Sequence, residues 1–77
     1  MPSKQYLLNN FKSCTAMLNY TAANYDCSTD LDFIKRLAND QYVVRCHLAS
    51  NSSRTFDGSG TDKREALAFC ISTKFPS

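Results

Sequence analysis

The sequence predicts a small α+β domain in which an antiparallel β-hairpin packs against helices. The 77 residues suffice for a single domain, 1–77. An alternating segment over 41–48, a polar turn and a short second strand predict the hairpin, and the run 61–71 predicts a capped helix after it. Helical periodicity before the hairpin completes the order α-α-β-β-α, with an N-terminal helix in 1–24 and an α-β-β-α unit in 25–77.

The first predicted helix covers residues 4–23. Ser3 is a suitable N-cap, because its hydroxyl can accept a hydrogen bond from a free backbone N–H of the first turn. Apolar residues then recur at steps of three and four, which places them on one helix face. These residues are Leu7, Phe11, Cys14, Leu18, Ala22 and Tyr25.

A second helix is predicted between residues 28 and 39. The sequence Ser28-Thr29-Asp30 provides a helix start, and acidic residues there suit the positive end of the helix dipole. Its expected buried stripe consists of Leu31, Ile34, Leu37 and Ala38. The pair Asn39-Asp40 is expected to end this helix.

The hairpin strand 41–48 is half apolar, which predicts one covered and one exposed face. Tyr42, Val44, Cys46 and Leu48 share one face, whereas Val43, Arg45 and His47 share the other. In the last helix, Asp62 and Glu65 resemble a capping box. The segment 66–71 is apolar all round, so we expect this helix to be central to the core.

Composition excludes several classes of protein. Hydrophobic residues make up 43% and charged residues 21%, which is typical of a globular chain and not of a disordered one. No apolar run approaches membrane-spanning length, and the N-terminus lacks the apolar core of a signal peptide. We therefore expect a cytoplasmic protein without membrane partners, whose four cysteines are reduced thiols.

Catalytic and metal-binding patterns are weak. His47, the one histidine, follows Cys46 on a strand, where neighbouring side chains point to opposite faces. A zinc site drawing on Cys14, Cys27, Cys70 and either Cys46 or His47 is one alternative, but the chain has no C-x-x-C pair. Small apolar core residues are the other reading of these cysteines. We expect no enzyme, no cofactor and no metal.

Basic residues are the candidate binding residues. Arg45 and His47 lie on the predicted outer hairpin face, Arg54 lies on the predicted second strand, and Lys63 and Arg64 begin the last helix. Together they could form a surface for nucleic acid or an acidic protein, although Asp40, Asp57 and Asp62 would dilute it. The segment Gly58-Ser59-Gly60 before a helix start suits a bound phosphate, or else a flexible strand end.

Two family resemblances follow from these segments. Tyr25-Asp-Cys-Ser-Thr-Asp30, followed by an amphipathic helix, a hairpin and Gly60-Thr-Asp-Lys-Arg-Glu-Ala-Leu-Ala-Phe-Cys70, resembles the phage α-β-β-α sandwich domain over about 25–74. The Ser-Thr-Asp and Ala-Phe-Cys-Ile runs match, while the tyrosine is displaced by two residues. This resemblance implies a phage or prophage accessory protein.

The segment Gly58-Ser-Gly-Thr-Asp-Lys-Arg-Glu-Ala66 is also similar to the end of the double-stranded RNA-binding domain. That resemblance implies that Lys63 and Arg64 hold phosphates across a groove and read its shape. Asp62 replaces a small residue of the family and Leu67 replaces a lysine. The family also has three strands after its first helix, whereas 28–39 predicts a helix here.

Our leading expectation is a non-enzymatic phage-type protein that binds and blocks a host protein or nucleoprotein complex, as an anti-CRISPR-like inhibitor does. The exposed hairpin edge would serve for host binding or for a homodimer. The alternative is a double-stranded RNA-binding module that uses Lys63, Arg64 and Arg54.

Overall fold

The computed structural model describes residues 3–28, 32–36 and 40–74, with the backbone alone for 32–36 and for 74. Its elements are α1 (Lys4–Asn10), α2 (Cys14–Asn24), β1 (Asp32–Arg36), β2 (Gln41–His47), β3 (Thr55–Gly60) and α3 (Lys63–Lys74). The predicted α+β class is confirmed: two helices come first, an antiparallel β2–β3 hairpin follows, and a helix ends the order.

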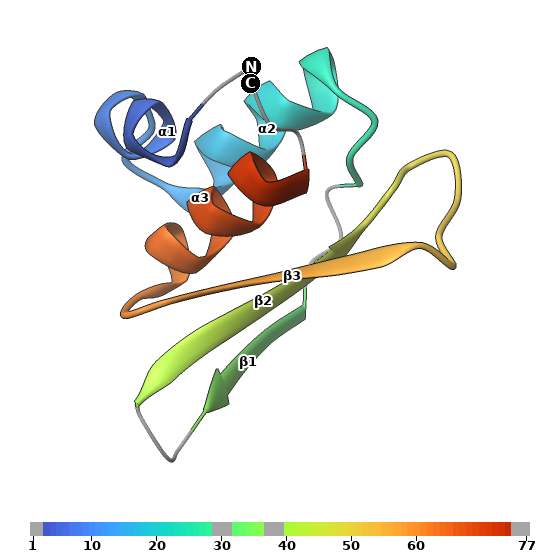
Figure 1. Ribbon diagram of the computed structural model, residues 1–77. Helices are drawn as coiled ribbons and strands as arrows, with labels where there is room; N and C mark the ends of the chain where they lie inside the picture. Colours follow the sequence, from blue (N-terminus) through green and yellow to red (C-terminus); the bar gives the residue numbers. More distant parts are fainter. Residues whose placement is uncertain (1–2, 29–31, 37–39, 75–77) are drawn as a thin grey trace.

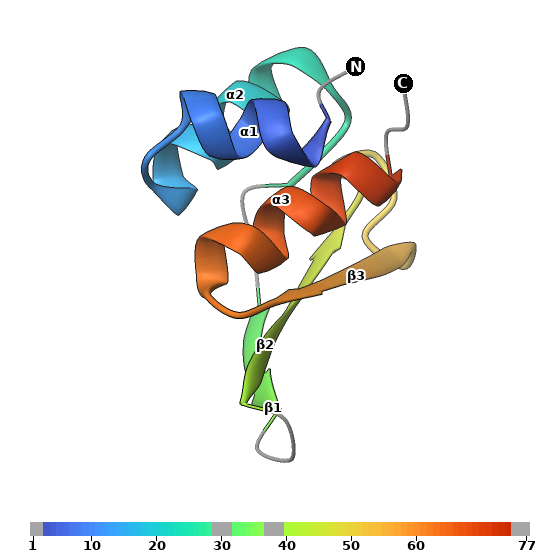
Figure 2. The same cartoon turned by 60° about the vertical axis from the view of Figure 1, so that its left-hand side comes forward.

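The molecule is layered. Helix α3 packs on β2 and β3, and α1 and α2 pack against α3 on its far side from the sheet (Figure 1). Figure 2 confirms that these three helices lie on the same side of the sheet. Strand β2 therefore has one covered face, on which Val44 and Cys46 are fully buried, and one open face, on which Arg45 is exposed. This agrees with the alternation in the sequence, although Val43 on the open face is only 6% exposed.

The first predicted helix is two helices, because the chain turns between Asn10 and Cys14. Phe11 is extended, with φ −127° and ψ 116°, and Ser13 then caps a new helix by accepting a hydrogen bond from the N–H of Ala16 at 3.1 Å. The expected cap at Ser3 is confirmed, since its side chain accepts from the N–H of Tyr6.

The turn also changes which residues of α2 are buried. The expected stripe continued the phase of α1, but the break resets it, so Met17 and Thr21 are fully buried while Ala22 is exposed. The buried hydroxyl of Thr21 is satisfied, because it donates to the carbonyl oxygen of Met17 at 2.9 Å.

The prediction of a helix over 28–39 is wrong for the part of that range that the structure describes. Residues 32–36 form β1, which pairs antiparallel with β2, from Asp32 opposite Arg45 to Arg36 opposite Gln41. The sequence Phe33-Ile34 suits a strand, and a short apolar run does not separate helix from strand by periodicity. Asp40, before β2, has φ 55°, a left-handed conformation that an aspartate tolerates. The sheet order is therefore β1-β2-β3.

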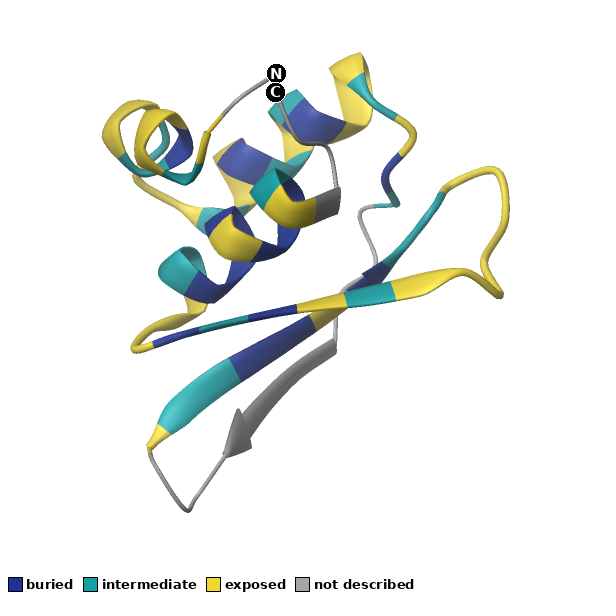
Figure 3. Ribbon diagram, viewed as in Figure 1, coloured by how far each residue is buried: buried dark blue, intermediate teal, exposed yellow. Residues whose placement is uncertain are grey.

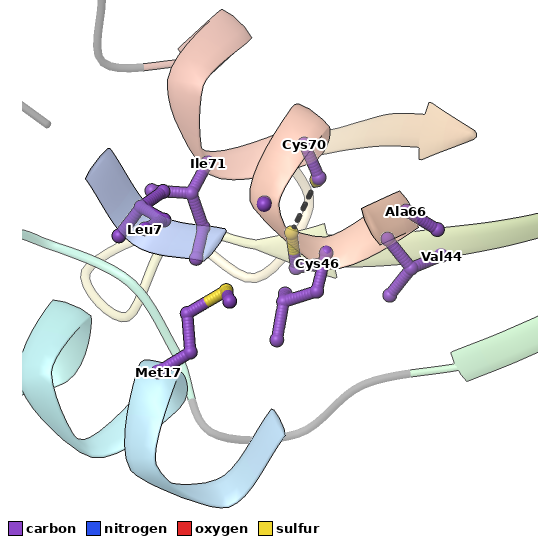
Figure 4. Packing of buried hydrophobic residues seen from close by; sticks show 9 residues of the cluster. Leu7, Met17, Val44, Cys46, Ala66, Cys70 and Ile71 are labelled. Carbon is purple, nitrogen blue, oxygen red and sulfur yellow. Dashed lines mark hydrogen bonds between the residues drawn. The ribbon is translucent and has the colours of Figure 1, made fainter. Parts of the chain in front are cut away.

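The core lies between α3 and its neighbours on both sides (Figure 3). The prediction that α3 is central is confirmed, because five of its residues are fully buried: Ala66, Leu67, Ala68, Cys70 and Ile71. Figure 4 shows Leu7 and Met17 from the N-terminal helices beside this cluster, with Val44 and Cys46 from β2.

Gly58 sets the spacing between α3 and the sheet. A Cβ atom built on Gly58 would lie 2.3 Å from the backbone nitrogen of Cys70 and 2.6 Å from the carbonyl oxygen of Ala66. Only glycine permits such an approach between two backbones. This glycine therefore positions α3, and with it the start of that helix.

Candidate nucleic-acid interface

A shallow groove of about 420 Å³ lies where α2 and α3 begin. Both helix starts are capped, by Ser13 and by Asp62, and both contribute to the groove wall. The register explains why β2 also reaches it: Tyr42 pairs with Gly60, the last residue of β3 before α3. The residues that line the groove are Lys12, Ser13, Cys14, Tyr42, Asp62, Lys63 and Arg64.

Lysine side chains give the groove its positive charge. Lys63 is exposed in the first turn of α3, and Lys12 is exposed directly before the cap of α2. Both sit beside the positive ends of helix dipoles, so dipole and side chain favour an anion at the same place. Among the described residues that line the groove, Asp62 is the one acidic residue, beside three basic ones.

Asp62 has a structural task at this position. Its carboxylate accepts a hydrogen bond from the N–H of Glu65 at 2.8 Å, and the Glu65 carboxylate accepts from the N–H of Thr61 at 3.1 Å. The predicted capping interaction is confirmed, with the return hydrogen bond made to Thr61. The negative charge of Asp62 is therefore partly offset by the backbone N–H that it accepts at the helix start.

Arg64 holds the first helix in place. Its Nη1 donates to the carbonyl oxygens of Leu8 and Phe11, at 2.6 and 2.9 Å. These carbonyls belong to the end of α1, where a helix lacks internal donors. Arg64 therefore lines the groove as a structural residue, because its Nη1 group is already hydrogen-bonded to the end of α1.

The five predicted binding residues do not form one surface. Lys63 and Arg64 are at the groove, whereas Arg45 is on the open face of the sheet, away from the helices. His47 pairs with Thr55 at the opposite end of the hairpin, and Arg54 directly precedes that strand. Six residues of β3 separate Arg54 from the groove, a distance of about 20 Å.

The expectation that Asp57 offsets the positive charge on this surface is confirmed at Arg45. Its Nε donates to one carboxylate oxygen of Asp57 at 3.0 Å and its Nη2 donates to the other at 3.1 Å. This bidentate pair crosses two neighbouring strands. Arg45 is thus engaged in a cross-strand ion pair on the open face.

Sequence reasoning missed Lys12 and Tyr42. Lys12 falls within the single helix predicted over 4–23, although the following Ser13 is a recognisable N-cap residue. Tyr42 lies on the covered strand face, as its place in the alternation predicts. Its position beside Lys12 and Cys14 depends on where the chain turns between α1 and α2. Only the folded arrangement places these residues beside Lys63.

The cysteines fall into two environments. Cys14 lines the groove, and burial followed by the charge of Asp62 raises its pKa. Cys27, Cys46 and Cys70 are buried, and all four are free thiols. Among the residues described, no group of three His, Cys, Asp or Glu side chains is arranged to hold a metal ion.

Comparisons with known proteins found no matching protein-family model, curated protein or solved structure. Within the described part of the chain, the helices are all too short or too polar to cross a membrane.

Proposed function

We propose that this chain is a double-stranded RNA-binding module whose contact surface is the groove at the starts of α2 and α3. The observation that carries this proposal is the three-stranded antiparallel sheet followed by α3, with Lys63 in the first turn of that helix. The similarity of 58–66 to the double-stranded RNA-binding domain implied three strands, and β1 is the strand that the sequence did not predict.

The arrangement of elements suits recognition of a duplex by shape. The Arg36–Gln41 pair, the Tyr42–Gly60 pair and the start of α3 lie at one end of the sheet, and the start of α2 meets them there. A-form RNA presents phosphates and 2′-hydroxyls across a wide, shallow minor groove. Exposed lysines beside helix N-termini suit phosphate contacts without base reading.

Fluorescence anisotropy with a labelled RNA duplex of about 20 base pairs tests this proposal. We expect tighter binding to the RNA duplex than to the same DNA duplex or to single-stranded RNA. Binding should weaken steeply between about 50 and 200 mM salt. A Lys12→Glu, Lys63→Glu double variant should lose more than tenfold in affinity, and its salt slope should fall by about 2.

Arg54→Glu is the control, because it reverses one charge, half the change of the double variant, at the far end of the sheet. It should leave most of the affinity. Arg64 is left intact in this test, since changing it would also release α1. Equal losses in the control and at the two lysines, or no preference for RNA duplexes, would contradict the proposal.

A second candidate function is the phage-type accessory protein that blocks a host protein or nucleoprotein complex, as an anti-CRISPR-like inhibitor would. Support for it comes from β3, which has β2 as its strand neighbour and lies at an edge of the sheet. Such an edge accepts an added strand from a host protein or from a second copy of this chain. The free thiols fit a reducing compartment, and we place either function in the cytoplasm.

A tagged pull-down from bacterial lysate, with and without nuclease, separates the two candidates. A stoichiometric protein complex that survives nuclease and forms equally with the Lys12→Glu, Lys63→Glu variant supports the blocker. Recovery of RNA, with every protein partner lost on digestion, supports the RNA-binding module.

A further inference from the structure

The core contains a pair of thiols in direct contact. Cys46 on β2 and Cys70 on α3 are fully buried, and their sulfur atoms lie 2.8 Å apart (Figure 4). The Cys70 thiol also lies 3.6 Å from the carbonyl oxygen of Phe56. The two cysteines are 24 residues apart in sequence, so the tertiary fold alone brings them together.

The approach of α3 to the sheet explains this contact. Gly58 lets the backbone of α3 near Cys70 lie against β3, and Gly58 pairs with Val44 on β2. Cys46 is the next residue along the same face of β2, opposite Phe56. The thiol of Cys70 therefore lies over β2 at the position of Cys46, with no side chain between the two sulfurs.

We propose that Cys46 and Cys70 are a modification site: they form a reversible disulfide when the folded protein meets hydrogen peroxide. One thiolate attacks a peroxide oxygen, the O–O bond breaks, and the hydroxide that leaves takes up the thiol proton as water. The sulfenic acid formed is then attacked by the second thiolate. The S–O bond breaks, the S–S bond forms, and a second water leaves, so two thiols and one peroxide yield one disulfide and two waters.

Peroxide suits this site because it is small, so a local opening of the fold is enough to admit it to a buried thiol. The rate is set by the thiolate fraction. A hydrogen bond with Cys46 and burial raise the pKa of Cys27. The pKa of Cys46 is also raised, because the hydrogen bond with Cys70 and burial outweigh the lowering effect of Cys27. The folded protein therefore reacts slowly at neutral pH and faster as the pH rises.

Cys27 is a second possible partner for Cys46, so the choice between Cys27 and Cys70 can be tested. It lies within hydrogen-bonding reach of Cys46 and is 2% exposed, so it is the competing partner for the same sulfur. The sulfur–sulfur contact of 2.8 Å favours Cys70 as the partner of Cys46. Cys14 lines the surface groove and serves as the thiol outside this cluster.

The test is mass spectrometry of the native wild-type protein. The protein is treated with hydrogen peroxide at about pH 8.5, near the ordinary thiol pKa, then unfolded, and its remaining thiols are blocked with N-ethylmaleimide. We expect two of the four thiols to escape blocking, a peptide that links Cys46 to Cys70, and full reversal by dithiothreitol. The melting temperature of the oxidised form should rise by about 10 °C or more, because the link closes a loop that joins β2 to α3.

Two variants and one condition serve as controls. Cys14→Ala should give the same linked peptide, whereas Cys70→Ala should abolish it. The same oxidation in urea should give a mixture of pairings, which shows that the native fold selects the partner. A native product linked through Cys27, or four thiols still blocked after peroxide treatment, would overturn the proposal.

Discussion

Replacing Gly58 with alanine should displace α3 from the sheet. The new Cβ would lie 2.3 Å from the backbone nitrogen of Cys70, which is 1.1 Å short of the 3.4 Å at which ordinary contact begins. The second obstacle is also backbone, the carbonyl oxygen of Ala66 at 2.6 Å, so no side-chain rotation relieves the overlap. The helix must therefore move, and it carries five fully buried residues with it.

The expected cost is about 3 kcal/mol, at the upper end of the range for overpacked cores. The entropy that alanine removes from the unfolded chain offsets only about 0.4–1 kcal/mol of this. A net loss of about 2–3 kcal/mol lowers the melting temperature of a domain of this size by roughly 10–20 °C. It also removes most of the stability expected for a chain this short, about 3–5 kcal/mol.

Circular dichroism melting with urea titration measures this effect. Ser59→Ala is the matched control, because Ser59 is the next residue of β3 and points to the other face of the sheet. It should change the melting temperature by less than about 3 °C, in line with a surface substitution of under about 0.5 kcal/mol. If Gly58→Ala melts within that same margin of the wild type, the close approach of α3 to β3 is not a determinant of the fold.

Three further predictions concern charge and protonation. Arg64→Met should destabilise the domain by about 2 kcal/mol in urea unfolding, because the end of α1 loses a charged donor, while Arg54→Met should be nearly silent. The folded state raises the pKa of Cys27 above 9.0, so above about pH 9 the unfolded chain releases a proton that the folded chain keeps. The free energy of unfolding should then fall by up to about 1.4 kcal/mol per pH unit through this thiol, and Cys27→Ala should flatten that decline; an unchanged slope would contradict it. Asp57→Asn should cost less than about 1 kcal/mol by thermal melting, since the ion pair with Arg45 is half exposed, at 50% and 42% of the side chains.

The candidate site was only partly predictable. Lys63 was identified because a basic residue in the first turn of a capped helix can be recognised from local sequence. Arg64 was identified on the same grounds, but its guanidinium is directed at the end of α1, more than fifty residues away in sequence. Lys12 was missed because its role depends on a turn within what the periodicity presented as one helix.

The sequence by itself determined the α+β class, the hairpin 41–60, and the capped, central last helix. Each rests on a local pattern: alternation along a strand, a polar turn, or a cap followed by an apolar run. Tertiary structure decided the state of residues 32–36, because a short apolar run becomes a strand only when β2 offers its edge. It also decided the break between α1 and α2, the groove at their junction with α3, and the contact of Cys46 with Cys70. These features join segments far apart in the chain, and the energy that selects them comes from packing and hydrogen bonds that exist only after the chain has folded.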